Sequence, residues 1–213
     1  MSTQYFMDKS PELRPFIEAA KQSGLSRFLV EKLGRELKES GTIRPTDIVP
    51  AVASKKDGSP SVFPMAWGYT NPRSASPLVN CRSETAASKP FWRESWERHR
   101  CVLPASCYFE WEHSTAPSGK KKAGQKYAIQ PAGQALTFLA GIYHIEERNG
   151  VRFPVFAVLT KEPVDSIRFI HDRMPVILSQ EMIRQWISPD GQPDNVIKTA
   201  LTEMYYEPTG ING

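Results

Sequence analysis

Glu110 and His171 are the two side chains of this sequence whose types and settings best suit proton transfer. Glu110 lies in CYFEWEH (107–113), where the alternation of a strand places it beside Tyr108 and opposite an apolar face. If that apolar face packs on the core, Glu110 is exposed. If Glu110 instead lines a concave sheet face beside Tyr108, burial would raise its pKa and suit it to moving protons.

His171 lies in RFIHDRMP (168–175), directly before Asp172. A neutral imidazole can shuttle a proton near pH 7, and the neighbouring carboxylate could orient the ring. A lone histidine is also commonly structural, so both interpretations stay open. The remaining histidines stand at a helix end, at a strand end and in a strand: His99, His113 and His144.

The segment NCRSET (80–85) carries a third polar group. In an extended chain Asn80, Arg82 and Glu84 share one face. Arginine offers a planar fork of donors, which suits it to anions and carbonyls. The alternative is a surface strand held by salt bridges.

The cysteines exclude some chemistry. Cys81, Cys101 and Cys107 are odd in number and form no CxxC pair, so we expect neither a disulfide framework nor a zinc site. No GxGxxG or GxxxxGK[ST] loop is present, and we expect no cofactor and no metal. A thiol hydrolase pairing one of these cysteines with His171 is a further hypothesis, although none lies in a recognisable nucleophile turn.

Length and charge set the broad class. A chain of 213 residues fits a single domain over 1–213, and a net charge of +4 permits a nucleic acid partner without requiring one. The absence of a signal peptide and of an apolar run near 18 residues predicts a cytoplasmic protein without a membrane, which we expect to be a monomer. The lysines at 120–122 indicate a solvated hairpin loop, or a loop that touches a phosphate backbone.

The helices and strands that must position these residues can be read from the hydrophobic pattern. Along the chain its period changes from that of helices to that of strands and back. The pattern predicts α+β, because helices and strands do not alternate as in a doubly wound sheet. Asp57-Gly58 predicts a hairpin turn between two strands. Helices are expected near 10–24, 26–40, 88–99, 179–187 and 194–204, and strands near 48–54, 61–69, 78–86, 101–104, 107–113, 126–130, 136–144, 153–160 and 175–179.

Three segments in this order, VNCRSETA (79–86), CYFEWEH (107–113) and FIHDRMP (169–175), resemble the SOS response-associated peptidase (SRAP) family. MAWGY (65–69) and IRPTDIVP (43–50) are similar to its pattern as well. The resemblance implies curved, mostly antiparallel sheets with a barrel-like core and flanking helices. It also implies binding of single-stranded DNA at abasic sites, and peptidase- or lyase-like chemistry that includes self-processing of the N-terminus.

In the family, the residue exposed by removal of the first methionine is a cysteine. Its α-amine attacks the sugar aldehyde to give an imine, and its thiol closes a thiazolidine. The resemblance then implies that Glu110 positions the amine and the sugar hydroxyl. His171 would act as general acid, and Asn80 would hold the N-terminal segment or the sugar.

The DNA contacts follow from the same motifs. Arg82, Thr160 and Arg173 are implied to contact phosphates that flank the lesion. Trp67 is implied to stack on or wedge against a base, where aromatic stacking contributes roughly 1–3 kcal/mol.

The beginning of the chain departs from the family's Met-Cys-Gly-Arg. Here Met1 is followed by Ser2, Thr3 and Gln4, so Ser2 stands in the place of the nucleophile and Gln4 in that of a DNA-binding arginine. A hydroxyl closes the ring far less well than a thiol, which predicts imine-only or impaired chemistry at Ser2. The alternatives are a non-catalytic paralogue that binds damaged DNA, and an altered terminus, natural or engineered, on an active scaffold.

Overall fold

The computed structural model describes residues 3–115 and 121–210, with the side chains at 114–115 and 121–123 excepted. Strand β3 spans Ile48–Ser54, and every residue in it but the last is buried. Its partner β4 is joined to it by the predicted turn, where Gly58 adopts φ 80° and its N–H donates to the Lys55 carbonyl at 3.0 Å. Glycine is favoured there because a positive φ brings a Cβ too close to the backbone.

The β3–β4 hairpin is part of a closed ring of strands. Pairing runs from β10 through β4, β3, β6 and β9 back to β10, antiparallel throughout except between β10 and β4. Closure leaves no edge in this part of the sheet and encloses a core of buried apolar side chains. The ring strands are β3, β4 (Pro60–Trp67), β6 (Arg100–Ala105), β9 (Thr137–Arg148) and β10 (Val151–Lys161).

Three short strands extend this ring. β5 adds to β10 in parallel, β11 adds to β10 in antiparallel fashion, and β12 pairs with β9. They matter for function because β5 lies in the predicted polar segment 80–85 and β11 ends the segment 168–175. Their bounds are Asn80–Arg82 for β5, Met174–Pro175 for β11 and Ile177–Leu178 for β12.

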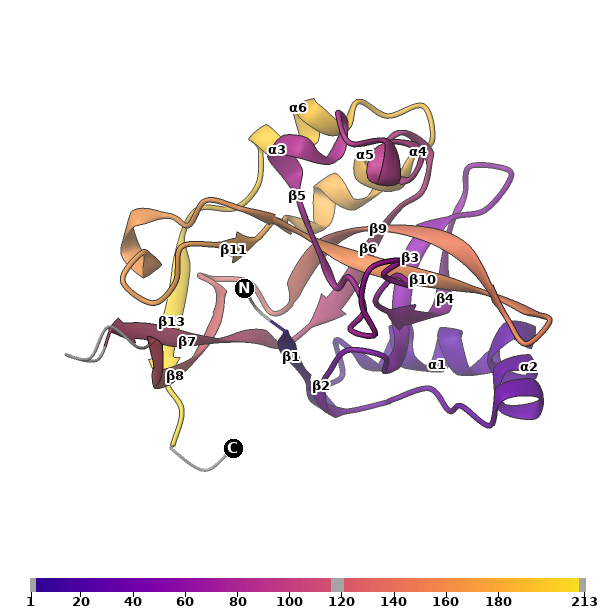
Figure 1. Ribbon diagram of the computed structural model, residues 1–213, viewed down its shortest axis with the longest axis horizontal. Helices are drawn as coiled ribbons and strands as arrows, with labels where there is room; N and C mark the ends of the chain where they lie inside the picture. The colour runs from indigo at the N-terminus through magenta and orange to yellow at the C-terminus, as the bar shows by residue number, and fades with distance from the viewer. Residues whose placement is uncertain (1–2, 116–120, 211–213) are drawn as a thin grey trace.

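A second sheet lies beside the barrel, with strand order β13-β8-β7-β1-β2 and every pairing antiparallel. Figure 1 shows β7, β8 and β13 projecting to one side, while β1 lies near the centre of the molecule. The beginning of the chain is therefore built into a sheet. Its strands are β1 (Gln4–Met7), β2 (Gly41–Ile43), β7 (Cys107–Thr115), β8 (Lys121–Pro131) and β13 (Met204–Pro208).

The helices form two groups on opposite sides of the barrel (Figure 1). Helices α1 and α2 form the first group, which packs on β3 and β4. Helices α3 to α6 form the second group, on the other side of the barrel. None of the helices in the described part of the chain has the length and apolar character needed to cross a membrane. The helices are α1 (Arg14–Gln22), α2 (Gly24–Leu33), α3 (Ser83–Ala86), α4 (Pro90–Arg98), α5 (Ile183–Ile187) and α6 (Pro193–Lys198), with 3-10 turns η1 (Asp165–Ile167) and η2 (Gln180–Met182).

The α+β class and the curved, barrel-like core are confirmed. The predicted end of the second helix is wrong. Gly34, not Gly41, ends α2 in the left-handed conformation, with φ 61°, and its N–H donates to Val30 at 2.9 Å. The residues beyond it turn away because Lys38 donates its backbone N–H to the Ile48 carbonyl at 2.7 Å.

Two other expected elements are divided by tertiary pairing. The predicted strand 78–86 contains β5 only up to Arg82, and Ser83 then begins α3, so Glu84 leaves the face that it was expected to share with Asn80. The predicted helix 194–204 ends at Lys198, and Met204 opens the missed edge strand β13, which pairs with β8.

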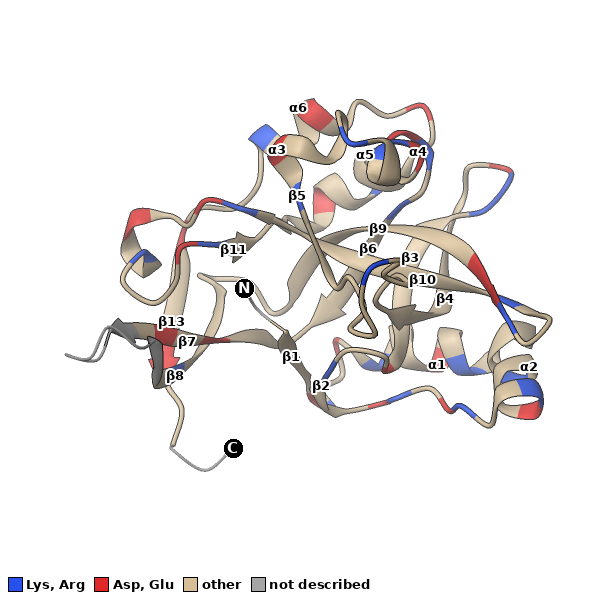
Figure 2. Cartoon of the chain, viewed as in Figure 1, with Lys and Arg blue, Asp and Glu red and all other residues tan. Residues whose placement is uncertain are grey.

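The charges show no single cationic face. Figure 2 shows Lys and Arg segments interspersed with Asp and Glu segments around the periphery of the fold. With a net charge of only +4, electrostatic attraction to a polyanion must come from local groups of basic residues rather than from the whole surface.

Candidate functional site

Glu110 occupies the centre of the site because both faces of β7 are covered. The residue is only 3% exposed, although the alternation of the strand would also fit an exposed carboxylate. Its neighbours on both faces of the strand, Tyr108 and Phe109, are buried as well. The second of the two sequence interpretations therefore describes the structure, with Glu110 held inside the fold on the same face as Tyr108.

The N-terminal strand passes along this carboxylate. β1 pairs antiparallel with β7, with Gln4 opposite Phe109 and Tyr5 opposite Tyr108. Continued by one residue, the same register would set Thr3 opposite Glu110. Tyr5 is 1% exposed and packs against Trp67 at 5.2 Å between ring centroids, so the start of the strand is anchored by an aromatic side chain.

His171 approaches Glu110 from the connection between η1 and β11. Its Nε2 lies 3.9 Å from Glu110 Oε1, and the two side chains are 5% and 4% exposed. The pair is thus brought together from distant segments, as a shared site would require. The buried environment excludes most of the water that would otherwise solvate both groups.

The pKa of Glu110 is raised to about 7 in total: burial raises it most and the Asp172 carboxylate adds to the rise, while the backbone N–H of Trp111 lowers it. Desolvation is the main cause because it disfavours the charged carboxylate. Near neutral pH this group can therefore either hold or release a proton, which an exposed glutamate does not do.

The neutral imidazole ring of His171 can carry its proton on either nitrogen, and its neighbours accommodate both tautomers. Its Nδ1 accepts the backbone N–H of Arg173 at 3.0 Å, which leaves the ring proton on Nε2, toward Glu110. The same Nδ1 lies 2.7 Å from Asp172 Oδ1, and a proton on Nδ1 would bond there instead. A single nitrogen cannot do both, so the ring presents either a proton or a lone pair to Glu110.

Arg173 holds the histidine loop in place. Its guanidinium donates to both carboxylate oxygens of Glu84 at 2.8 Å and to the Thr160 carbonyl at 2.7 Å. Arg173 is 12% exposed and Thr160 only 1%. This arrangement engages polar groups of both residues inside the protein, so their predicted contacts with phosphates stay a prediction.

Trp67, which is predicted to stack on a base, is buried in this structure. It is 2% exposed, its ring is stacked on Phe156 at 6.0 Å between centroids, and its Nε1–H donates to the Val79 carbonyl at 2.9 Å. These contacts occupy the ring, and its stacking on a base stays a prediction. Trp67 packs in the core between the N-terminal strand and β10.

Gln4 and Asn80 lie close together in the fold. Both line a small cavity, with about 10 Å³ of room for the centre of a water molecule, together with Tyr5 and Tyr108. Such a space is the size of one small polar group. Arg82, at the end of β5, is exposed and remains available to a phosphate.

The cysteines show no sign of a nucleophile. All three are buried, and burial raises the pKa of the Cys81 thiol to about 12 and that of Cys107 to about 11. Buried thiols of this kind are inert, since the thiolate is the reactive form. Two other predictions, Ser2 and the lysine run at 120–122, lie outside the described residues and side chains.

Sequence analysis predicted no role for two histidines that the fold places in polar groups. His113 follows an irregularity in the β7–β8 register, between Trp111 and His113, and its ring lies 3.9 Å from that of His171. A bulge re-aims the side chains that follow it, which simple alternation does not show.

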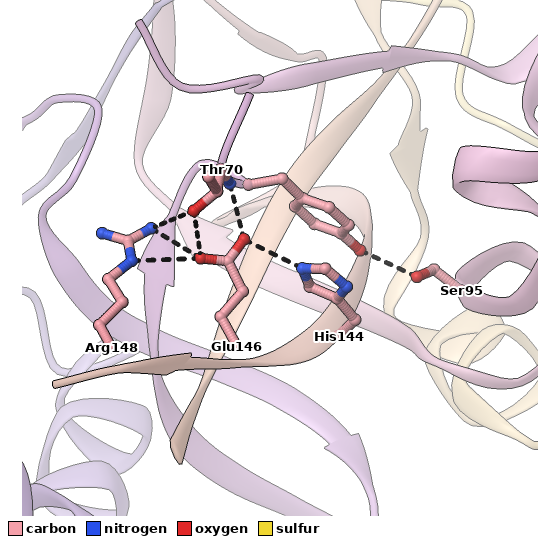
Figure 3. A network of polar contacts seen from close by, with 6 residues as sticks. Thr70, Ser95, His144, Glu146 and Arg148 are labelled. Carbon is pink, nitrogen blue, oxygen red and sulfur yellow. Dashed lines mark hydrogen bonds and ion pairs between the residues drawn. The ribbon is translucent and has the colours of Figure 1, made fainter. Parts of the chain in front are cut away.

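His144 belongs to a separate network around Glu146 (Figure 3). Glu146 accepts hydrogen bonds from the backbone and hydroxyl of Thr70 and pairs with His144 at 3.1 Å and Arg148 at 2.8 Å. These bonds overcome the effect of burial and lower the pKa of Glu146 to about 2. The network ties β9 to the segment after β4, so its evident role is structural.

Comparison with known proteins matches almost the whole chain to one family, described as SOS response associated peptidase (SRAP), over residues 13–209. "Abasic site processing protein YobE" of Bacillus subtilis is 27% identical over 195 residues, covering 87% of this chain and 84% of that protein. YoaM of the same organism, with the same description, is 27% identical over 173 residues and covers 78% and 73%. "Abasic site processing protein YedK" of Escherichia coli is 31% identical over 135 residues, or 63% and 58%.

Solved structures share the fold. A protein from Bacteroides thetaiotaomicron superposes with a TM-score of 0.74 at 20% identity, covering 99% of this chain and 93% of the other. A phage-related protein from Bordetella bronchiseptica gives a TM-score of 0.67 at 21% identity, covering 97% and 93%. The arrangement of barrel, second sheet and helices is therefore shared beyond the reach of close sequence similarity.

Proposed function

The chain belongs to the SOS response associated peptidase (SRAP) family, and from this premise we propose that it binds single-stranded DNA at abasic sites and engages the sugar aldehyde through its N-terminal residue. The observation that carries the proposal is the buried Glu110–His171 pair, with Nε2 and Oε1 3.9 Å apart, beside the strand that begins the chain. The relatives described as abasic site processing proteins support the choice of lesion.

The chemistry starts from a free α-amine, which Ser2 would present once Met1 is removed. An α-amine has a pKa near ~8, so a useful fraction is unprotonated at neutral pH. Its nitrogen attacks the aldehyde carbon of the ring-opened sugar and forms a carbinolamine. Loss of water then gives an imine, and the departing hydroxyl takes a proton in that step.

Glu110 and His171 supply the proton transfers in this proposal. His171 with its proton on Nε2 acts as the acid that assists sugar ring opening and departure of water. Glu110 beside it accepts a proton from the attacking amine. Asn80, which lines the same small cavity as Gln4, holds the N-terminal segment or the sugar.

Serine limits the outcome. The Ser2 hydroxyl is a poor group for closing a five-membered ring on the imine, so the product stays a reversible imine and no lasting cross-link forms. An imine can also promote elimination of the phosphate on the β-carbon, which would cut the strand. A peptidase activity would be confined to processing of the N-terminus.

A second candidate function is binding without chemistry. The replacement of Cys, Gly and Arg by Ser2, Thr3 and Gln4 favours it, because the thiol and a cationic contact are lost together. The protein would then shield damaged single strands. Binding would depend steeply on salt, since it releases counterions from the phosphates.

Borohydride trapping separates the two candidates. The protein is incubated with a single-stranded oligonucleotide containing one abasic site, with or without borohydride, and resolved on a denaturing gel. A tetrahydrofuran site, which lacks the aldehyde, is the matched control. We expect an adduct only with borohydride and only on the aldehyde, mapped by peptide mass to the amine of residue 2.

The other outcomes are equally informative. A heat-stable adduct without borohydride would contradict the imine-only account of Ser2. An adduct mapped to a lysine would contradict the role of the N-terminus. Salt-sensitive binding with no adduct under either condition would replace the first candidate by the second.

A further inference from the structure

Three side chains that can ligate a metal ion lie together near Glu110. One of them, His171, belongs to the proposed catalytic pair, but the three have no joint role in the proposed chemistry. One ligand atom from each of His113, His171 and Asp172 lies within 4.8 Å of the other two. The two imidazole rings are 3.9 Å apart between centroids, and His171 Nδ1 lies 2.7 Å from Asp172 Oδ1.

The backbone holds the two contributing segments together. The N–H of His113 donates to the carbonyl of Ile170 at 3.1 Å, which joins β7 to the residue directly before His171. The register irregularity after Trp111 aims the His113 ring at this point. The ligand set is thus largely positioned before any ion arrives, which lowers the cost of binding.

The close contact between His171 and Asp172 itself favours a cation. The lone pair of His171 Nδ1 accepts the backbone N–H of Arg173 at 3.0 Å, so an ion bound at Nδ1 takes the place of this hydrogen bond. A positive charge shared between Nδ1 and the Asp172 oxygen 2.7 Å away stabilises their close approach, and a proton or a metal ion can supply that charge.

The surroundings admit an ion from solvent. His113 and Asp172 are exposed, and the group opens into a cavity of about 450 Å³ that Glu162 and Arg168 also line. The guanidinium of Arg168 is paired with Asp165 at 3.1 Å, which offsets its repulsion of a cation. The carboxylates of Glu162 and Asp172 attract one.

Two imidazoles and a carboxylate suit a borderline divalent ion, and Zn²⁺ commonly takes three such protein ligands and one water. We propose that His113, His171 and Asp172 bind Zn²⁺ and that the bound ion withdraws His171 from proton transfer. The second half of this proposal rests on the proposed function. Glu110, on the Nε2 side of the ring, then becomes the carboxylate partner that metal-bound histidines usually have.

Binding is tested without reference to DNA. Full-length protein is stripped with EDTA and titrated with Zn²⁺ against a chromophoric chelator, and with Co²⁺ to record the absorption of a four-coordinate ion. We expect one ion per chain in the wild type. His113→Phe keeps a ring against His171 but removes the ligand, and it should weaken Zn²⁺ binding at least about tenfold, as should Asp172→Asn. His99→Phe is the matched control and should bind like the wild type.

Two results would overturn the metal site: no stoichiometric Zn²⁺ binding by the wild type, or equal binding by His113→Phe. The effect on chemistry is tested by borohydride trapping with and without Zn²⁺. The ion should slow trapping by the wild type, EDTA should restore it, and His113→Phe should trap at the metal-free rate in both cases. Zn²⁺-loaded wild type that traps at the metal-free rate would refute the regulatory half. If no preparation traps DNA, the proposed function fails while the titration still decides the metal site.

Discussion

The Nε2 atom of His171 lies 3.9 Å from the Oε1 atom of Glu110, and each side chain is about 95% buried. Neither the burial of these side chains nor their proximity follows from the local sequence around either residue. Glu110 lies on β7, which β1 and β8 make an inner strand of its sheet, and His171 is brought to it by a loop that Arg173 ties to Glu84.

Replacing Glu110 by glutamine should slow imine formation about 10²-fold, the lower end of what a positioned acid or base contributes. The amide keeps the shape of the side chain but cannot accept the proton. The rate of borohydride trapping under single-turnover conditions measures the effect. Glu112→Gln, on the same strand, is the control and should trap at the wild-type rate; an equal loss in both variants would refute the role given to Glu110.

Ser2→Cys should convert the trapped imine into a cross-link that survives heating without borohydride, because a thiol closes the five-membered ring. Intact mass spectrometry should show loss of Met1 in both proteins. The adduct is scored on a denaturing gel with the tetrahydrofuran oligonucleotide as control. A variant with a processed terminus that still yields no stable adduct would show that more than the sulfur has been lost.

Arg82→Ala should weaken binding to single-stranded DNA and lower the slope of log K against log salt by about 0.7, the value for one phosphate contact. Arg82 is exposed at the end of β5, which leaves its guanidinium accessible. Fluorescence anisotropy at several salt concentrations gives the slope. Arg27→Ala, on α2, should leave the slope unchanged, and a slope unchanged in Arg82→Ala as well would remove this contact.

Arg173→Lys tests whether Arg173 supports the His171 loop rather than contacting a phosphate. Lysine cannot donate to both oxygens of Glu84 and to Thr160 at once, so the free energy of unfolding should fall by about 1–3 kcal/mol. Trapping should slow because the His171 loop loses its support, while the salt slope of binding should stay at the wild-type value. A reduced slope would return Arg173 to the phosphate-binding residues.

The stability of the protein should fall in acid partly through Glu146. Its pKa is about 2 in the folded protein, below the ordinary value of 4.5, so the unfolded state binds the proton first. The stabilisation is present above pH 4.5 and is lost as the pH falls toward 2. His144 and Arg148 face the carboxylate and keep it ionised.

Denaturant unfolding at pH 7 and pH 3 measures this loss. Glu146→Gln should lose about 1–2 kcal/mol less than the wild type between the two pH values, since one pKa unit corresponds to about 1.4 kcal/mol. Glu147→Gln, an exposed neighbour on β9, should behave like the wild type. Equal losses in all three proteins would show that the network does not contribute in this way.

Local signals were enough for part of the fold. Strand β3 has the predicted bounds, and the Asp57-Gly58 turn joins it to β4 as expected, because alternation and turn residues act over a few neighbours. The same signals failed where distant strands compete for the chain. Gly34 and Gly41 are both plausible helix ends, and only the pairing of Lys38 with Ile48 decides that α2 ends at Gly34.

The sequence by itself determined the α+β class and, through three ordered motifs, the family, and it predicted roles for Glu110, Asn80 and His171, because residue types and their order are properties of the chain. Only the tertiary structure decided which side chains are buried. Alternation gives two faces of a strand but does not say what covers them, so Glu110 could be exposed or enclosed. For the same reason Trp67 and Thr160 turned out to be internal, and His113 came to lie against His171.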